Sequence, residues 1–282
     1  MIFLKKDLPY EHWEISQEDT GNRLRIVPER GGLITQWFCN GRDVIYFDGN
    51  RFLQKSKSVR GGIPILFPIC GSLVDGSVQL LDQSFSIPQH GFARDCKWEL
   101  TPTKDQKGVL LSLTENKKTL SLFPYHFLIE MEIFLMQSSI DFKITIFNRS
   151  EDMMPFSFGL HPYFKVMDLK EIKIEGLCSK CMNHLTMIES DTELELSYLE
   201  KGIDFLSSPL ETVTLVDFLA NKKIKVLFEK PMDLGVIWTD PPRSMVCIEP
   251  WTSPRNSLNT GDRLQFIKPG CKQEMRCSFL EC

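Results

Sequence analysis

The segment at residues 155–165, PFSFGLHPYFK, places a histidine in an aromatic setting. Phe156 and Phe158 alternate with smaller residues, which is typical of a half-buried strand. Pro162 is expected to end this strand because proline cannot donate a ladder hydrogen bond. His161, which titrates near neutral pH, either faces a ligand at the strand end or is a core side chain satisfied by the backbone.

A carboxylate stands in a comparable position in the segment at residues 245–261, MVCIEPWTSPRNSLNTG. Residues 245–248 form a short apolar strand, and Glu249 follows directly before Pro250 and Trp251. Desolvation between the strand and the indole would raise the pKa of Glu249, because burial disfavours the charged form. The alternative interpretation is a structural ion pair between Glu249 and Arg255.

Two loops combine basic residues with glycines. Residues 58–72, SVRGGIPILFPICGS, carry Arg60 directly before a glycine pair, and residues 88–98, PQHGFARDCKW, carry His90 and Arg94. Because the first loop is apolar enough to be partly buried, the Arg60 guanidinium is expected to face an anionic or hydroxyl-rich partner. The alternatives are a surface arginine beside a turn and, for His90, a turn histidine.

Two groups of residues have some of the ligands of a metal site, but neither is expected to bind a metal. Cys178 and Cys181 lie near His184, but a structural zinc site usually has four ligands and no second matching pair is evident, so chance spacing is favoured. A two-histidine, one-carboxylate site formed by His90, His161 and Glu249 in a cupin-like barrel is also disfavoured, because the sequence lacks the short His-x-His motif of such sites. The nine scattered cysteines are expected to be reduced thiols.

The elements that must position these residues are strands. Alternating apolar residues predict a long β-hairpin, with strands at residues 127–135 and 140–146. Shorter strands are predicted at the ranges 23–27, 33–38, 44–47, 212–216, 224–228, 235–238 and 274–280. No comparably long stretch has helical spacing, and no linker or repeat is evident. The sequence therefore predicts a single all-β, antiparallel domain over residues 1–282.

Composition excludes several classes of function. The 282 residues carry a formal net charge of −4, which offers no electrostatic footprint for nucleic acid. The N-terminus does not resemble a signal peptide, and no apolar run reaches the roughly 20 residues that span a bilayer. A cytoplasmic protein without membrane partners is expected.

Taken together, four segments resemble a known family: SVRGGIPILFPICG, PQHGFARDCKWEL, FSFGLHPYFKV and VCIEPWTSPRNSLNTG. In this order and spacing they are similar to the galactose mutarotase-like superfamily, the aldose 1-epimerases, and most of all to its glucose-6-phosphate 1-epimerase branch. The resemblance runs from about Arg23 to the C-terminus. It implies a large antiparallel β-sandwich with few short helices and a sugar held in an open cleft.

The resemblance also implies an isomerase that interconverts the α and β anomers of a hexose or hexose 6-phosphate by ring opening, with no metal or organic cofactor. In the implied site Glu249 is the general base and His161 the general acid. Substrate-binding residues would be Arg60, His90, Arg94 and, from a looser match, Asp204.

The sequence offers opposing indications about the sugar. Arg60 and Arg94 on two loops around one cleft favour a phosphorylated substrate, because guanidinium groups bind phosphate bidentately. Against this, Phe67 and Ile69 stand where the phosphate-using branch tends to carry tryptophans. The alternative function is a non-catalytic carbohydrate-binding or regulatory module. Loss of the acid or the base would favour this alternative, but His161 and Glu249 are both present.

Overall fold

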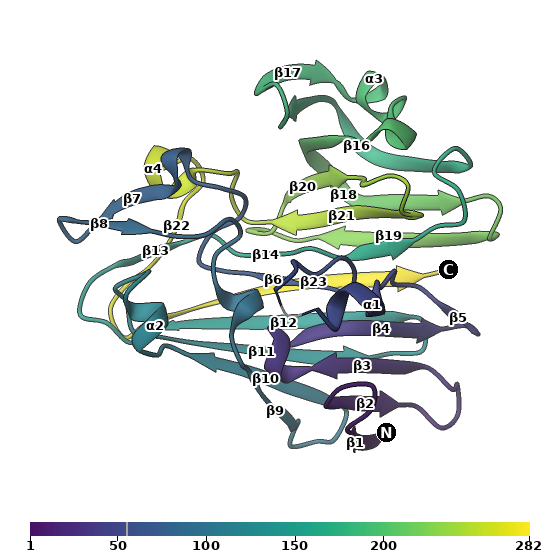
Figure 1. Cartoon of the computed structure of the whole chain (residues 1–282), viewed down its shortest axis with the longest axis horizontal. Helices are drawn as coiled ribbons and strands as arrows, with labels where there is room; N and C mark the ends of the chain where they lie inside the picture. Colours follow the sequence, from purple (N-terminus) through teal and green to yellow (C-terminus); the bar gives the residue numbers. More distant parts are fainter. Residues whose placement is uncertain (55) are drawn as a thin grey trace.

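The computed structural model describes residues 1–54 and 56–282, and antiparallel strands make up most of its regular secondary structure (Figure 1). Two large sheets form the body of the fold. The smaller of them has five strands in the order β1-β2-β3-β4-β5, with β1 (Ile2–Lys6), β2 (His12–Ser16), β3 (Arg23–Val27), β4 (Leu33–Cys39) and β5 (Arg42–Asp43). Two-stranded sheets pair β7 (Ser77–Leu80) with β8 (Gln83–Ser86) and β13 (Met154–Phe156) with β22 (Gln265–Ile267).

The second large sheet runs in the order β6-β14-β21-β20-β18-β19-β23-β12-β11-β10-β9, and β15, β16 and β17 pair beside this path. Its strands are β6 (Ile65–Leu66), β9 (Glu99–Pro102), β10 (Gly108–Thr114), β11 (Phe127–Leu135), β12 (Ser139–Asn148), β14 (Gly159–Leu160), β15 (Tyr163–Lys165), β16 (Ile172–Asn183), β17 (Ile188–Asp191), β18 (Asp204–Asp217), β19 (Lys222–Phe228), β20 (Leu234–Trp238), β21 (Met245–Trp251) and β23 (Lys272–Glu281).

Helices are short and connect the strands. The α-helices are α1 (Gly49–Phe52), α2 (Lys117–Leu120), α3 (Thr192–Leu196) and α4 (Ser257–Thr260). Single 3-10 turns are η1 (Pro28–Arg30), η2 (Val74–Gly76), η3 (Ala93–Asp95) and η4 (Leu199–Lys201). Within residues 1–54 and 56–282, none of the helices is long and apolar enough to cross a bilayer.

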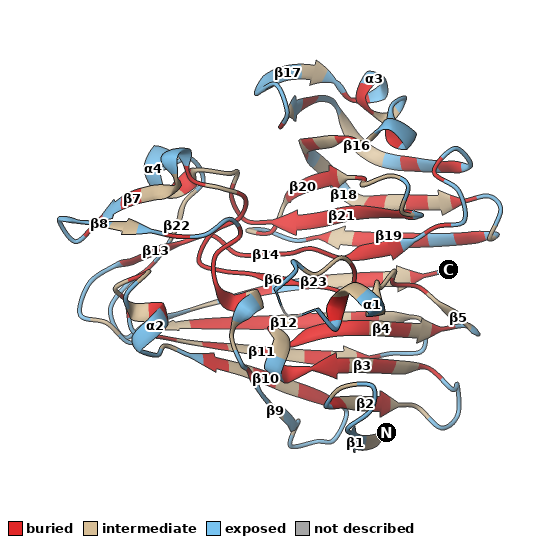
Figure 2. Ribbon diagram, in the orientation of Figure 1, coloured by how far each residue is buried: buried red, intermediate tan, exposed pale blue. Residues whose placement is uncertain are grey.

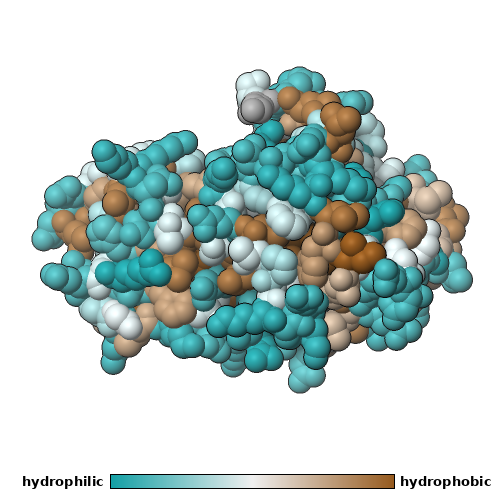
Figure 3. Space-filling view, turned by 90° about the horizontal axis from the view of Figure 1, so that it is seen from below, coloured by the Kyte–Doolittle hydropathy of each residue, from teal (hydrophilic) through white to brown (hydrophobic). Residues whose placement is uncertain are grey.

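The two large sheets share one core. Ile26 and Trp37 from the smaller sheet belong to the same buried cluster as Leu111, Ile129 and Ile144 from the larger sheet. Figure 2 shows buried segments on strands of both sheets. On the face drawn in Figure 3, hydrophilic side chains cover most of the surface and hydrophobic ones gather in smaller areas. The predicted antiparallel β-sandwich with few short helices is therefore confirmed.

The predicted hairpin is confirmed as β11 and β12, whose register pairs Ile129 with Ile146 and Ile133 with Phe142. Residues in β11 alternate between buried and partly exposed along the whole strand. This alternation arises because one face of the pair packs in the core and the other meets solvent.

Two strand predictions need correction. Residues 44–47 do not form a ladder: the backbone N–H of Val44 donates to Trp37, while that of Tyr46 donates to Tyr163, so the segment bridges different partners. The strand before His161 ends at Leu160, in agreement with the prediction that Pro162 stops it, and a separate strand, β15, begins at Tyr163 and pairs with β21. Residues 156–164 are buried rather than half-buried, since the segment lies between β6 and β21.

Strand β21 gives the site its framework. Val246 and Ile248 belong to the main core, whereas the intervening Cys247 and Glu249 point to the other face, as the period-two geometry of a strand requires. Cys247 lies opposite Tyr163 of β15 and Trp238 of β20. Glu249 lies opposite Val236 of β20.

The loop of residues 88–98 is anchored by a close backbone approach at Gly91. This glycine has φ +74°, and a Cβ there would lie 2.0 Å from the carbonyl oxygen of Phe67. The backbone N–H groups of Phe92 and Ala93 donate to the same oxygen. A side chain at residue 91 would therefore force the loop away from Phe67 and shift its neighbour His90.

We expect Gly91→Ala to destabilise the protein more than Gly261→Ala. Both positions have a left-handed φ, which costs an alanine about 1–2 kcal/mol, but a Cβ at Gly261 meets no atom within 4 Å. The measurement is the free energy of unfolding from urea titration of both variants. If the two variants lost equal free energy of unfolding, the close approach of residue 91 to Phe67 would add nothing to the destabilisation.

Candidate active site

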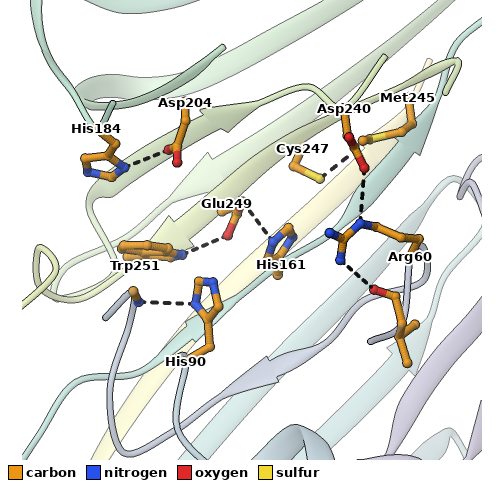
Figure 4. Close-up of polar contacts among 12 residues, drawn as sticks. Arg60, His90, His161, His184, Asp204, Asp240, Met245, Cys247, Glu249 and Trp251 are labelled. Atoms are coloured by element: carbon orange, nitrogen blue, oxygen red, sulfur yellow. Dashed lines mark hydrogen bonds and ion pairs between the residues drawn. The ribbon is translucent and has the colours of Figure 1, made fainter. Parts of the chain in front are cut away.

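The residues predicted for the site converge on one cavity of about 220 Å³. They come from separate loops and strands, and the lining includes each of the six: Arg60, His90, Arg94, His161, Asp204 and Glu249. Figure 4 shows most of these side chains around the end of β21. The cavity is partly open to solvent.

His161 and Glu249 form the most buried polar pair of this cavity. His161 Nε2 lies 3.3 Å from Glu249 Oε1, and the Glu249 side chain is only 2% exposed. The other carboxylate oxygen, Oε2, accepts a hydrogen bond of 3.1 Å from Trp251 Nε1 (Figure 4). The carboxylate is therefore held on one oxygen by the indole and presents the other to the imidazole.

Burial shifts the pKa values of both groups of the pair. Burial raises the pKa of Glu249 well above its usual value, as expected from the sequence, and the nearby Asp204 carboxylate, which was not part of that expectation, raises it further. Burial also lowers the pKa of His161, and the neighbouring His90 and Arg94 lower it further. Because burial disfavours both charged forms, the free pair holds a single proton in the neutral arrangement, with this proton on Glu249, rather than forming an ion pair.

Aromatic rings fix the plane of the His161 imidazole. The ring stacks on Tyr163 with 4.7 Å between centroids and 8° between planes, and the edge of Trp238 meets it at 5.7 Å. The backbone N–H of His161 donates to Pro64 in the loop that carries Arg60. The imidazole is thus oriented by packing.

His90 belongs both to a turn and to the cavity. Its φ is +64°, and its Nδ1 accepts a 3.2 Å hydrogen bond from the backbone N–H of Gly71. This bond places the proton of the neutral ring on Nε2. Burial lowers the pKa of His90 to about 3, with the Arg94 charge as the second cause. The fold is a sandwich rather than the cupin-like barrel in which the metal site of His90, His161 and Glu249 was considered.

Arg60 has the acidic partner that its burial predicted. Arg60 Nε lies 3.1 Å from Asp240 Oδ2, and the same oxygen accepts a bond of 2.8 Å from Arg243 Nη1. The Arg60 guanidinium also lies over the Trp238 ring, 5.6 Å from its centroid. One carboxylate is thus shared by two guanidinium groups, which leaves net positive charge at this side of the cavity.

Arg94 is less strongly paired. Its Nη2 donates to the carbonyl oxygen of Gln89 at 2.8 Å, while its Nε lies 3.9 Å from a carboxylate oxygen of the exposed Asp95. Burial lowers the pKa of Arg94. Its guanidinium is therefore the more available of the two predicted arginines for an anionic ligand.

Asp204 organises the opposite side of the cavity. Asp204 Oδ1 is 2.7 Å from His184 Nδ1, and Oδ2 is 3.5 Å from Arg255 Nη2. Within the described ranges, Arg255 thus pairs with Asp204. The alternative interpretation from the sequence, an ion pair between Arg255 and Glu249, is therefore replaced. His184 serves this network rather than a zinc site, and the thiol of Cys181 contacts the carbonyl oxygen of Ser190 instead.

Three residues around the cavity, Tyr163, Trp238 and Asp240, were not predicted from the sequence, and a fourth, His184, was considered only as a zinc ligand. Tyr163 and Trp238 orient His161, Asp240 holds Arg60, and His184 holds Asp204. Tyr163 lies inside a motif that was recognised, and the position of Trp238 at the end of a predicted strand was the available signal. Asp240 carries no motif, because its role depends on a contact across 180 residues of sequence.

Comparisons with known proteins agree with this architecture. A family model described as aldose 1-epimerase matches residues 14–279. A "Putative glucose-6-phosphate 1-epimerase" of Cenchrus ciliaris is 28% identical over 225 residues, which are 74% of this chain and 64% of that protein. The match therefore spans less than two thirds of that relative's length.

Two solved structures illustrate the likeness in fold. The Slr1438 protein from Synechocystis sp. PCC 6803 superposes with a TM-score of 0.92 at 33% identity, covering 100% of this chain and 98% of that one. A galactose mutarotase-like protein from Clostridium acetobutylicum gives a TM-score of 0.82 at 18% identity, with 100% and 98% of the two chains covered.

We expect the His90 imidazole to stay neutral where an unperturbed histidine becomes charged, at a pH of about 6.5. Its pKa of about 3 means that the folded state binds fewer protons than the unfolded state as the pH falls below 6.5, so this group lowers stability in acid. The measurement is a ¹⁵N NMR titration of the histidine rings, with His90→Gln to assign the signals. A midpoint near 6.5 for His90 would contradict its buried, hydrogen-bonded placement.

Proposed function

We propose that this chain, which belongs to the aldose 1-epimerase family, is a mutarotase that interconverts the α and β anomers of a hexose or hexose 6-phosphate. The observation that carries the proposal is the pair of His161 and Glu249, 3.3 Å apart in a cavity that a sugar can enter. The cavity walls offer hydrogen-bonding groups on several sides, as recognition of a sugar requires.

The reaction needs an acid and a base that act on neighbouring atoms. Opening a hemiacetal ring removes the proton of the anomeric hydroxyl while the ring oxygen gains one. Both oxygens are bonded to C1, so two adjacent protein groups can serve them at the same time. Rotation about the C1–C2 bond then exposes the other carbonyl face, and the two groups act in reverse as the ring closes.

In this mechanism Glu249 is the general base and His161 the general acid. The raised pKa of Glu249 makes its carboxylate a stronger base than a free one, and the single shared proton can reside on His161 when the sugar binds. Trp251 keeps the carboxylate in place during the transfer by donating to Oε2. Both proton transfers of this mechanism use only the side chains of Glu249 and His161.

The remaining cavity residues would hold the sugar. Asp204 is already fixed by His184 and Arg255, so its oxygens are ready to accept bonds from sugar hydroxyls. The proton placed on His90 Nε2 can be donated to a sugar oxygen. Arg60 and Arg94 lie in the same lining and would bind an anionic substituent.

We expect Glu249→Gln and His161→Asn each to lower kcat by at least about 10²-fold, because each change removes one proton-transfer group. The measurement is anomer exchange of glucose and glucose 6-phosphate by NMR at saturating sugar. Glu132→Gln is the matched control, since Glu132 pairs with Lys143 on the solvent-facing side of β11. Wild-type turnover in Glu249→Gln would refute the proposed base, and no exchange by wild type would favour a non-catalytic sugar-binding module.

We further propose that the phosphorylated sugar is preferred. Three arginines line the cavity, and Asp204 already pairs with Arg255, so Arg60 and Arg94 leave positive charge for a ligand. Binding of a phosphate by guanidinium groups is a charge-assisted interaction and stronger than binding of a neutral hydroxyl.

We expect Arg94→Ala and Arg60→Ala to lower kcat/KM for glucose 6-phosphate by about 10- to 100-fold, and that for glucose far less. Arg263→Ala, which removes a guanidinium paired with Asp233 outside the cavity, should change neither. A wild-type preference for free glucose would refute the proposal. Arginine variants that lose equal activity on both sugars would refute it as well.

A further inference from the structure

A buried thiol lies directly beside the proposed acid–base pair. Cys247 precedes Glu249 by two residues on β21, so both side chains project from the same face of the strand. One ligand atom each from His161, Cys247 and Glu249 lie within 4.8 Å of one another, and the three residues are buried. The proposed mechanism gives this thiol no role.

We propose that His161, Cys247 and Glu249 bind a thiophilic divalent cation of the Zn²⁺ or Cd²⁺ class. Thiolate, imidazole and carboxylate are ligands that Zn²⁺ takes in proteins, at about 2.0–2.3 Å from the ion. Around a tetrahedral ion such ligands are roughly 3.3–3.8 Å apart, so modest side-chain rotations close the remaining distance. Three protein ligands leave the fourth position of a tetrahedral ion for water or another ligand.

The surroundings provide access and partial support for an ion. Glu249 and His161 line the open cavity, which gives the cation a route inward. Trp251 holds Glu249 Oε2 and leaves Oε1 for the metal, in the manner of an outer-shell partner. Within the described part of the chain, Cys247 Sγ makes a single weak hydrogen bond, of 3.9 Å to Met245 Sδ, which does not compete with a metal–thiolate bond.

Other features limit the affinity. His161 Nδ1 is buried and, among residues 1–54 and 56–282, has no hydrogen-bond partner, so no outer-shell group fixes the imidazole as in dedicated zinc sites. Arg60 and Arg94 line the same cavity and oppose a cation. The site is therefore suited to reversible occupation by a metal rather than to a permanent structural ion.

Metal binding must displace protons. The Cys247 thiol releases its proton to become the thiolate ligand, and the His161–Glu249 pair releases the proton that it shares. Occupation is therefore favoured as the pH rises. If the proposed mutarotase function holds, on which this consequence rests, a bound ion occupies both the acid and the base and inhibits the reaction.

The direct test is a Cd²⁺ titration of the full chain without sugar, in a background where the more accessible Cys96, Cys178, Cys271 and Cys282 are serine. We expect one Cd²⁺ per chain by calorimetry, together with the ultraviolet charge-transfer absorption of a cadmium–thiolate bond. Cys247→Ser should abolish this absorption and weaken binding at least tenfold. Cys277→Ser, which alters a buried thiol on β23, is the matched control and should change neither.

A second variant keeps the proposal testable if Cys247→Ser fails to fold. Glu249→Gln keeps the thiol, so saturating Cd²⁺ should still produce the charge-transfer absorption, but at least tenfold more metal should be needed. Absorption that persists unchanged in Cys247→Ser, or that is lost equally in Cys277→Ser, would overturn the proposal. So would an unchanged affinity in Glu249→Gln.

Inhibition is measured separately. Anomer exchange by the Cys247→Ser variant, relative to its own metal-free rate, should need at least tenfold more Cd²⁺ for half-inhibition than the background protein. Because binding is followed without sugar, it can succeed even if the chain catalyses no exchange. Absence of binding would reject the metal site and leave the proposed function standing.

Discussion

The burial of one carboxylate constrains the rest of the site. Glu249 is 2% exposed, and a buried carboxylate is costly unless its oxygens are hydrogen-bonded and its charge is compensated. Trp251 satisfies one oxygen, His161 approaches the other, and the stack of His161 on Tyr163 keeps it there. The strand order β14-β21-β20 brings these side chains together.

Loops complete the site, and contacts with the strands and with each other hold them in place. Arg60 is fixed by Asp240, and Pro64 of the same loop accepts from the backbone of His161. His90 is tied to Gly71 through both its backbone N–H and its imidazole. The polar groups of the cavity are therefore oriented before any ligand arrives, so binding does not have to pay for ordering them.

Much of this arrangement could be predicted from the sequence, for identifiable reasons. The alternation in β11 and β12 is local, and five of the six predicted cavity residues lie in segments with recognisable composition, whereas Asp204 rests on a looser match. Asp240 and His184 could not be assigned, because their roles depend on tertiary contacts with Arg60 and Asp204. Residues 44–47 were predicted as a strand because the turn dipeptides Asn40-Gly41 and Asp48-Gly49 flank them, whereas their backbone groups bond to separate segments.

The alternation along β21 has a consequence for folding fidelity. A slip of one residue in its pairing with β20 would turn Ile248 toward the cavity and drive Glu249 into the main core, away from Trp251 and His161. There the carboxylate would lose its partners at a cost that no added apolar contact nearby could offset. The acidic residue that serves the site thus also penalises the misaligned sheet, so chemistry and correct assembly depend on the same side chain.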